Sequence, residues 1–194
     1  MGIAGIIPSK EVMTPESILI IRPSAMGDII MASPMLAALR RAYPQARICW
    51  LVEPGFADLL RHNRDLDEVI LWSKVEWRRL VREKRFLELL HHVLALRREL
   101  RSHHFDLAID AVGLAKSRLL LACSGAKTKI GFDSKEPGSF LLDKIVVKSR
   151  NNPEMSSEYK QMILALGVEA DNFTPKITLS EAAIEEAHRL LGEY

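Results

Sequence analysis

A carboxylate at the start of a predicted helix, directly after a buried strand, is the feature of this sequence best suited to chemistry. Residues 18–21 are apolar throughout, as a strand covered on both faces of a parallel sheet is. A Pro/Ser/Gly turn follows, and Asp28 then stands on the first turn of an apolar-periodic segment. Open parallel sheets bind ligands where their strands end, so Asp28 is a candidate general base. The alternative is a structural carboxylate that the helix dipole stabilises.

The same turn offers groups that could bind an anion. The hydroxyl of Ser24 and the backbone amides around Gly27 are hydrogen-bond donors at a predicted helix start. The stretch matches neither G-x-x-x-x-G-K-S/T nor G-x-G-x-x-G. It therefore contains neither a Walker loop nor a dinucleotide fingerprint, and alone it does not identify a ligand.

A basic segment further along the chain is a second candidate site. Residues 74–101 contain nine Lys and Arg and four Glu. Trp77, Arg78 and Arg79 place an indole beside guanidinium groups, which bind carboxylates and phosphates in a bidentate manner. A charge run on a long helix can equally be a solvated face, so both interpretations stay open at this point.

Two later strand ends repeat the pattern of strand, polar turn and helix. The predicted strand 105–110 is followed by a turn at Gly113 and by Lys116 and Ser117 at a helix start. A polar loop at 133–137 follows the next strand in the same way. Because parallel strands end at one edge of a sheet, we expect these loops to converge with that of Asp28 on a shared ligand site.

Histidine and cysteine spacing does not predict a metal site. Four histidines lack Cys or carboxylate partners at metal-ligand spacing, and we expect them at the surface: His91, His92, His103 and His104. The two cysteines, Cys49 and Cys123, stand in apolar surroundings. This indicates buried free thiols in a reducing compartment.

The elements that would position these loops alternate between strand and helix. Further strands are predicted at 46–52, 68–72 and 128–132, with another strand or edge segment at 142–148. Predicted helices cover 28–43 (with a start or kink at Pro34), 55–61, 77–102, 116–123, 154–166 and the segment after Ser180. This alternation predicts a doubly wound α/β fold with a mostly parallel sheet.

Composition is that of an ordinary globular protein. The chain has 194 residues, of which 48% are hydrophobic and 27% charged, with a formal net charge of +2. This balance argues against a nucleic-acid partner. No run reaches the roughly 18 apolar residues that span a bilayer, so we expect a cytoplasmic protein, with peripheral membrane contact left open. Residues 1–17 lack the features of a signal peptide and are expected to be a disordered leader.

Several spaced motifs resemble the N-terminal half of glycosyltransferase family nine, the lipopolysaccharide heptosyltransferases. The turn 24–28 is similar to the family's S-x-M-G-D, and residues 105–117 to its D-x-x-I-D-x-x-G-L-x-K-S segment. Residues 50–57 resemble its second strand and turn, 77–79 its basic acceptor patch, and 135–137 its R/K-E-P. The resemblance covers about residues 18–194.

The resemblance implies an inverting transferase of the GT-B class, with two Rossmann-like domains and a site between them. Asp28 would be the catalytic base. The implied acceptor-binding residues are Ser24, Met26, Gly27, Trp77, Arg78, Arg79, Gly113, Lys116, Ser117, Lys135 and Glu136. Heptose would pass from an ADP-sugar, a substrate and not a cofactor, to the inner core of lipopolysaccharide at the inner membrane surface. No metal is implied.

The resemblance also implies a donor-binding domain that this sequence does not contain. Residues 18–180 would form the acceptor domain, and 181–194 a terminal helix at the boundary to the missing one. Donor-side residues therefore have no counterparts here, and the 194-residue chain alone is expected to be inactive. Two alternatives from other classes are a non-catalytic module that binds an anionic glycolipid and a phosphate- or nucleotide-binding regulator.

Overall fold

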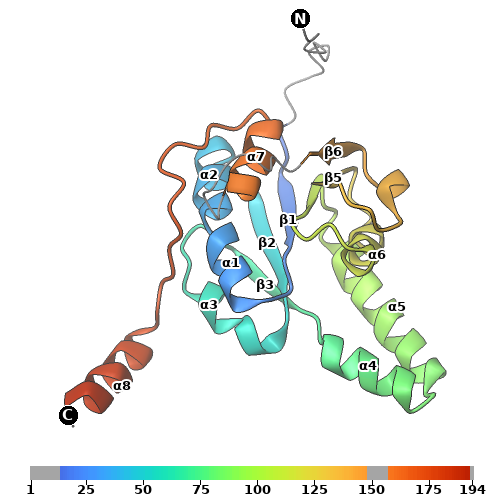
Figure 1. Ribbon diagram of the computed structural model, residues 1–194, viewed down its shortest axis with the longest axis horizontal. Coiled ribbons are helices and arrows are strands. Elements are labelled where there is room, and N and C mark those ends of the chain that lie inside the picture. The colour runs from blue at the N-terminus through green and yellow to red at the C-terminus, as the bar shows by residue number, and fades with distance from the viewer. Residues whose placement is uncertain (1–13, 148–156, 193–194) are drawn as a thin grey trace, which may run out of the picture.

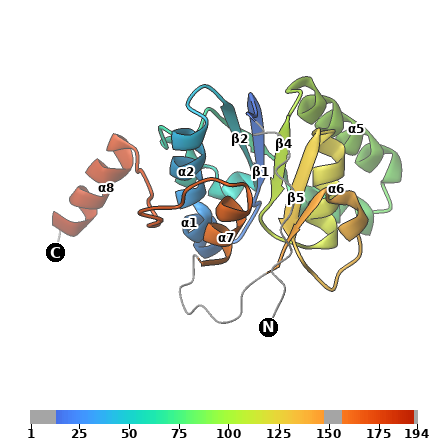
Figure 2. The same ribbon diagram turned by 90° about the horizontal axis from the view of Figure 1, so that it is seen from above.

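A six-stranded parallel sheet lies between two layers of helices in the computed structural model, which describes residues 14–147 and 157–192 (Figure 1, Figure 2). Its strand order is β3-β2-β1-β4-β5-β6, and every neighbouring pair is parallel. The strands are β1 (Ser17–Ile21), β2 (Arg47–Val52), β3 (Glu68–Leu71), β4 (Leu107–Asp110), β5 (Thr128–Phe132) and β6 (Lys144–Val146). The predicted doubly wound α/β fold is confirmed.

The strand order reverses beside β1. From β1 the chain passes outward through β2 to β3, and then crosses back so that β4 pairs with the other side of β1. Ile21, the last residue of β1, is in register with Leu51 of β2 and with Asp110 of β4. Such a switch point leaves a crevice beyond the carboxyl ends of the strands. The loops after β1, β2 and β4 therefore meet there.

Helices cover both faces of the sheet. The first face carries α1 (Met26–Ala32), α2 (Pro34–Ala42), α3 (Asp58–Arg61) and α7 (Ser157–Ala165). The second face carries α5 (Phe86–Ser102) and α6 (Ala115–Ser124), with α4 (Lys74–Arg82) leading into α5. Figure 2 shows the two layers on either side of the sheet. Two 3-10 turns, η1 (Pro54–Phe56) and η2 (Ser139–Leu141), and α8 (Glu181–Gly192) complete the described elements.

Burial on both faces explains why the central strands are apolar without alternation. All five residues of β1 are buried, and alternate side chains enter the two separate cores. Ile18 and Ile20 pack beneath α1 and α2, whereas Leu19 and Ile21 pack beneath α5 and α6. The helix α8 differs, because all of its described side chains are exposed and it extends away from the sheet (Figure 1).

Two predicted helices are each divided in the structure. The segment 28–43 forms α1 and α2, which meet at Ser33, because Pro34 starts the second helix at a position where its missing N–H is not needed. The continuous helix predicted at 77–102 is wrong. There α4 begins after the N-cap Ser73, whose hydroxyl accepts from the Glu76 amide at 3.2 Å, and α5 begins only at Phe86.

The break between α4 and α5 is a Schellman motif without glycine. Lys84 adopts a left-handed conformation with φ 58°. Its amide donates to the Val81 carbonyl at 3.1 Å, and the Arg85 amide donates to the Leu80 carbonyl at 2.9 Å. A helix end of this kind is recognised in a sequence by Gly or Asn at the left-handed position. Because Lys84 occupies that position, the sequence does not indicate the break between α4 and α5.

Other boundaries shift by a few residues. β1 includes Ser17, which the sequence pattern places in the leader, and β4 starts at Leu107 instead of 105. Residues 1–13 of that leader, the first residues of the helix predicted at 154–166 and the last of the strand predicted at 142–148 lie outside the described residues. Among the described helices, none combines the length and the apolar character needed to cross a membrane.

Replacing Lys84 with glycine should stabilise the chain. A left-handed conformation costs a side chain-bearing residue about 1–2 kcal/mol, part of which glycine loses again through its freer unfolded state. Lys84→Gly is therefore expected to raise the free energy of unfolding in urea by about 0.5–1 kcal/mol. Lys84→Val, which is β-branched, should lower it. Equal stability of the three proteins would contradict this assignment of the turn.

Candidate active site

The buried guanidinium of Arg22 organises the turn that follows β1. Its Nη1 donates to the carbonyl of Ala111, just beyond β4, at 3.0 Å, and its Nη2 forms an ion pair with the carboxylate of Asp28. The carbonyl of Arg22 accepts from the indole of Trp50 in β2 at 3.1 Å. Arg22 thus joins three neighbouring strands to the first turn of α1.

One oxygen of Asp28 is held and the other is free for a ligand. Oδ2 takes part in the Arg22 pair and accepts from the Ala25 amide at 3.3 Å. Oδ1 makes no hydrogen bond within the part of the chain that the structure describes, and the side chain is half exposed. Asp28 therefore acts as a helix cap through one oxygen, and it can still accept a proton through the other.

Asp110 shapes the loop that follows β4. Its side chain is fully buried, and its Oδ1 accepts from the amides of Val112 and Gly113 at 3.0 and 3.1 Å. Gly113 has φ +82°, and a Cβ there would lie 3.3 Å from Cβ of Phe132. The hydroxyl of Ser117 then exchanges hydrogen bonds with the backbone of Leu114 and caps α6.

The loop after β5 is fastened to α6 by charged groups. The Oε2 atom of Glu136 accepts from the Ala115 amide at 2.7 Å, at the start of that helix. The buried guanidinium of Arg118 donates to the carbonyls of Phe132, Glu136 and Pro137 at 3.1, 2.7 and 3.1 Å. Glu136 is therefore engaged in holding the loop, while the neighbouring Lys135 is exposed.

The segments that follow β1, β2, β3 and β4 border a cavity of about 370 Å³ at the carboxyl edge of the sheet. The loop 133–137 after β5, which was expected to converge on the same site, does not line this cavity. The charged lining of the cavity consists of three cationic and three acidic side chains: Arg22, Lys74, Lys116, Asp28, Glu53 and Glu158. Three polar atoms of its lining residues are buried without a hydrogen-bond partner: Nε of Arg22, Oε1 of Glu53 and Nε1 of Trp72. Buried polar atoms are normally paired, so this lining has capacity for a polar ligand.

A second hollow of about 270 Å³ adjoins the first. The two share Trp72, Lys74 and Lys116 in their walls. Trp77 and Arg78 of α4 line the second hollow, and the Trp77 ring meets that of Trp72 edge to face with centroids 5.5 Å apart. The basic start of α4 therefore lies directly beside the cavity that contains Asp28.

The structure brings together some of the predicted site residues and leaves others at the periphery. Ser24, Asp28, Lys116 and Ser117 line the cavity, and Trp77 and Arg78 line the hollow beside it. The remainder line neither space: Met26, Gly27, Arg79, Gly113, Lys135 and Glu136. Of these, Arg79 pairs with Glu76 at 2.7 Å, and Gly113 stands between Val112 and Leu114, which both line the cavity.

Several lining residues were missed by sequence reasoning. Arg22, Glu53 and Trp72 each follow directly on a strand, respectively β1, β2 and β3. The rule that ligands bind beyond the carboxyl ends of parallel strands could have identified them. Glu158 reaches the same cavity from α7, and no local pattern in the sequence marks it.

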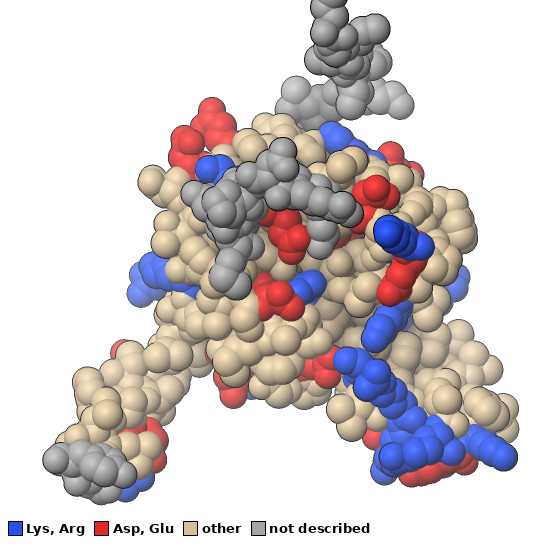
Figure 3. Space-filling view, in the orientation of Figure 1, with Lys and Arg blue, Asp and Glu red and all other residues tan. Residues whose placement is uncertain are grey.

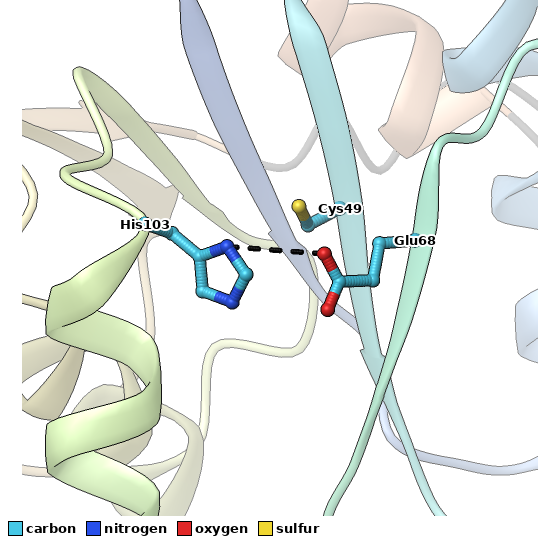
Figure 4. Close-up of side chains that lie close together, drawn as sticks. All are labelled: Cys49, Glu68 and His103. Atoms are coloured by element: carbon cyan, nitrogen blue, oxygen red, sulfur yellow. Dashed lines mark ion pairs between the residues drawn. The ribbon is translucent and has the colours of Figure 1, made fainter.

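A group of potential metal ligands lies near the amino ends of the strands (Figure 4). Cys49, Glu68 and His103 place their ligand atoms within 4.8 Å of one another. His103 is nearly buried and stacks on Phe105 at 5.2 Å, so its predicted surface position is wrong. Motif spacing could not reveal this group of three side chains, because Cys49 comes from β2, Glu68 from β3 and His103 from the end of α5.

The geometry of this group favours a structural role. The oxygen of Glu68 that faces Nδ1 of His103 at 3.8 Å also accepts from Arg47 at 2.5 Å. Burial, with the Glu68 charge, raises the pKa of the Cys49 thiol to about 12. A metal ion bound by this group would have to displace the Arg47 guanidinium from Glu68 and the proton from the Cys49 thiol.

Comparison with known proteins identifies the family. The model of "Glycosyltransferase family 9 (heptosyltransferase)" matches residues 93–193. The chain belongs to glycosyltransferase family 9. Lipopolysaccharide heptosyltransferase 1 of Escherichia coli K12 is 30% identical over 128 residues, which cover 62% of this chain and 38% of that protein. Its Pseudomonas aeruginosa namesake is 32% identical over 130 residues, covering 62% and 34%.

Solved structures share the fold of this family 9 chain. A family 9 glycosyltransferase from Veillonella parvula superimposes with a TM-score of 0.76 at 19% identity, covering 91% of this chain and 49% of that one. E. coli heptosyltransferase WaaC with ADP-2-deoxy-2-fluoro heptose gives 0.69 at 24% identity, covering 82% and 51%. The chain thus spans about half the length of these structures and less than half that of the curated relatives.

The two aspartates of the segment 105–117 should respond to pH in opposite directions. Burial raises the pKa of Asp110, against the lowering effect of its amide hydrogen bonds. Its folded state therefore favours the protonated form, and its contribution to stability is lost as pH rises above about 4. For Asp106 the hydrogen bond from Lys127 lowers the pKa, so its contribution is lost as pH falls.

Urea unfolding of Asp110→Asn and Asp106→Asn between acid and neutral pH tests this assignment. The amide oxygen introduced by Asp110→Asn can still accept from the turn, so the stability of this variant relative to wild type should increase as pH rises. Asp106→Asn should instead lose stability relative to wild type over the same range. A pH-independent difference for both variants would contradict the assigned environments.

Proposed function

We propose that this chain is the acceptor-binding part of an inverting transferase that moves heptose from an ADP-sugar to the inner core of lipopolysaccharide. The observation that carries the proposal is the half-held carboxylate of Asp28, which lines the cavity at the sheet's carboxyl edge. Family membership supports a glycosyltransferase reaction. The substrates of the named relatives support heptose and lipopolysaccharide.

In the proposed reaction Oδ1 of Asp28 takes the proton of an acceptor hydroxyl. The hydroxyl oxygen forms a bond to the anomeric carbon of the donor sugar, and the bond from that carbon to the ADP oxygen breaks. ADP leaves with the electron pair, and the configuration at the carbon inverts. Arg22 acts as a positioning residue, because it fixes the other carboxylate oxygen. The scheme uses no resident cofactor.

The lining of the two hollows suits an acidic, hydroxylated acceptor. Lys74, Arg78 and Lys116 offer cationic groups that can bind the carboxylates or phosphates of a Kdo–lipid A-like glycolipid. The unpaired atoms of Glu53 and Trp72 could hydrogen-bond the hydroxyls of a sugar. We therefore propose that eight side chains contact the acceptor directly: Lys74, Arg78, Lys116, Glu53, Trp72, Ser24, Trp77 and Ser117. Met26, Gly27, Arg79, Gly113, Lys135 and Glu136 would support the site from its rim.

The donor would be bound by a further domain. This part of the proposal rests on length, because the chain spans less than half of each curated relative that it matches. The ADP-sugar would approach Asp28 from outside the open cavity, and residues 14–192 alone would not complete transfer. We place the reaction at the cytoplasmic face of the inner membrane, where an acidic glycolipid acceptor would be available.

Asp28→Asn should abolish most transfer without unfolding the protein. A positioned general base typically contributes about 10²–10⁴ to the rate, and Asn cannot take the proton. The measurement is ADP release from ADP-heptose with a Kdo–lipid A acceptor, using the longest polypeptide that the gene encodes. Thermal unfolding reports on folding.

The matched control is Asp58→Asn. Asp58 also stands in the first turn of a helix, α3, but its side chain is 90% exposed and lies outside the cavity. This variant should keep wild-type turnover. Turnover of Asp28→Asn within a few-fold of wild type would eliminate Asp28 as the base.

A further inference from the structure

The junction between α4 and α5 exposes large apolar side chains to solvent. Phe86 is 60% and Leu87 76% exposed, while Val81 and Leu90 are each about half exposed. Phe86 and Leu90 are four residues apart and share one face of α5. We call residues 81–90 the α4–α5 tip. Clusters of exposed apolar side chains of this kind mark interaction surfaces.

The tip is also basic. Residues 74–90 contain six Lys and Arg against three Glu. Figure 3 shows Lys and Arg gathered at this end of the molecule, where α4 and the start of α5 project in Figure 1. Arg85 pairs with Glu83 and Glu88. In contrast, Arg78, Arg82 and Lys84 form no ion pair with any residue that the structure describes.

From these observations we propose that the α4–α5 tip inserts into the surface of an anionic lipid bilayer. Segments that combine exposed Phe and Leu with Lys and Arg lie at membrane interfaces, with the apolar side chains among the acyl chains and the cations at the headgroups. The anionic leaflet attracts the unpaired cations. This inference rests on the proposed function insofar as the acceptor is a membrane glycolipid.

The position of the tip connects the bilayer to the site. Val81, at the start of the tip, lines the 270 Å³ hollow together with Arg78, Lys74 and Lys116. The last two residues also line the cavity of Asp28. A glycolipid whose acyl chains remain in the bilayer would therefore meet a continuous basic wall that leads from the tip to the carboxylate.

The charge of the tip favours a bilayer over a second copy of the chain. Two tips brought face to face would place their unpaired Arg82 and Lys84 side chains close together, and like charges oppose such a contact. The exposed leucines of α8 provide a contrast. Leu190 and Leu191 lie on a helix with three Glu and one Arg, which an anionic surface would repel.

The test measures binding of this chain to vesicles by co-sedimentation. Vesicles of phosphatidylcholine alone are compared with vesicles that also contain phosphatidylglycerol. Wild type should bind the anionic vesicles, and added salt should weaken binding. Phe86→Ser with Leu87→Ser, and separately Arg82→Glu with Lys84→Glu, should each weaken binding by about tenfold or more.

The matched control replaces one Phe and one Leu outside the tip with Ser. Phe140→Ser with Leu191→Ser alters side chains that are 86% and 73% exposed on η2 and α8. It should bind as wild type does. The proposal is overturned by equal binding to both kinds of vesicle, or by equal losses in the control and the tip variants. It is also overturned if sedimentation shows a dimer that Phe86→Ser with Leu87→Ser dissociates.

Turnover of the longest polypeptide that the gene encodes, measured on an acceptor without acyl chains and beside its own vesicle binding, separates this proposal from the proposed function. Neither tip variant changes a residue that lines the cavity or the hollow, so both should keep wild-type turnover on the deacylated acceptor. If the tip variants lose vesicle binding while they keep this turnover, the result supports insertion of the tip into the bilayer. If the active wild-type protein does not bind vesicles, the proposed insertion of the tip into a bilayer is wrong, whereas the proposed transfer reaction is unaffected.

Discussion

The ion pair between the buried Arg22 and the half-exposed Asp28 is the interaction on which the site depends. A guanidinium taken out of water is costly unless it is paired and hydrogen-bonded. Here Asp28 supplies the charge and the Ala111 carbonyl an acceptor, while the Tyr159 ring lies 5.9 Å from the guanidinium carbon. The same contacts fix where β1 ends relative to β4 and α1. One pair thus sets both the packing at the switch point and the orientation of the carboxylate.

Around this pair, the ends of β2, β3 and β4 each add one part of the proposed acceptor site. The loop after β2 adds Glu53, the end of β3 adds Trp72, and the turn shaped by Asp110 after β4 leads to Lys116. Their positions follow from a parallel sheet, because all of these loops leave it at the same edge. The unpaired polar atoms that remain are those that a polar ligand would satisfy. The basic start of α4 then extends the site toward the exposed tip.

Features with a local signal could be predicted from the sequence, and features made by distant contacts could not. The apolar runs of β1 and β2 located these two strands, and the place of Asp28 directly after the β1 turn indicated that its carboxylate lies at the carboxyl edge of the sheet. The place of Arg22 at a strand end marks it as a candidate lining residue, but its hydrogen bond to the Ala111 carbonyl depends on β4 lying beside β1, which no local pattern shows. The division at Lys84 was hidden because a residue with a side chain takes the place of the usual glycine. His103 was misplaced because Cys49 and Glu68, which lie beside it in the fold, come from strands that are distant in the sequence.

A double-mutant cycle on turnover tests directly whether Arg22 acts by orienting Asp28. Arg22→Met and Asp28→Asn are measured singly and together, with folding checked by circular dichroism. If Arg22 acts by orienting Asp28, each single variant should lose most activity, and the double variant should lose little more than Asp28→Asn does. If the two losses multiply in the double variant, Arg22 and Asp28 act independently, and Arg22 does not act by orienting Asp28.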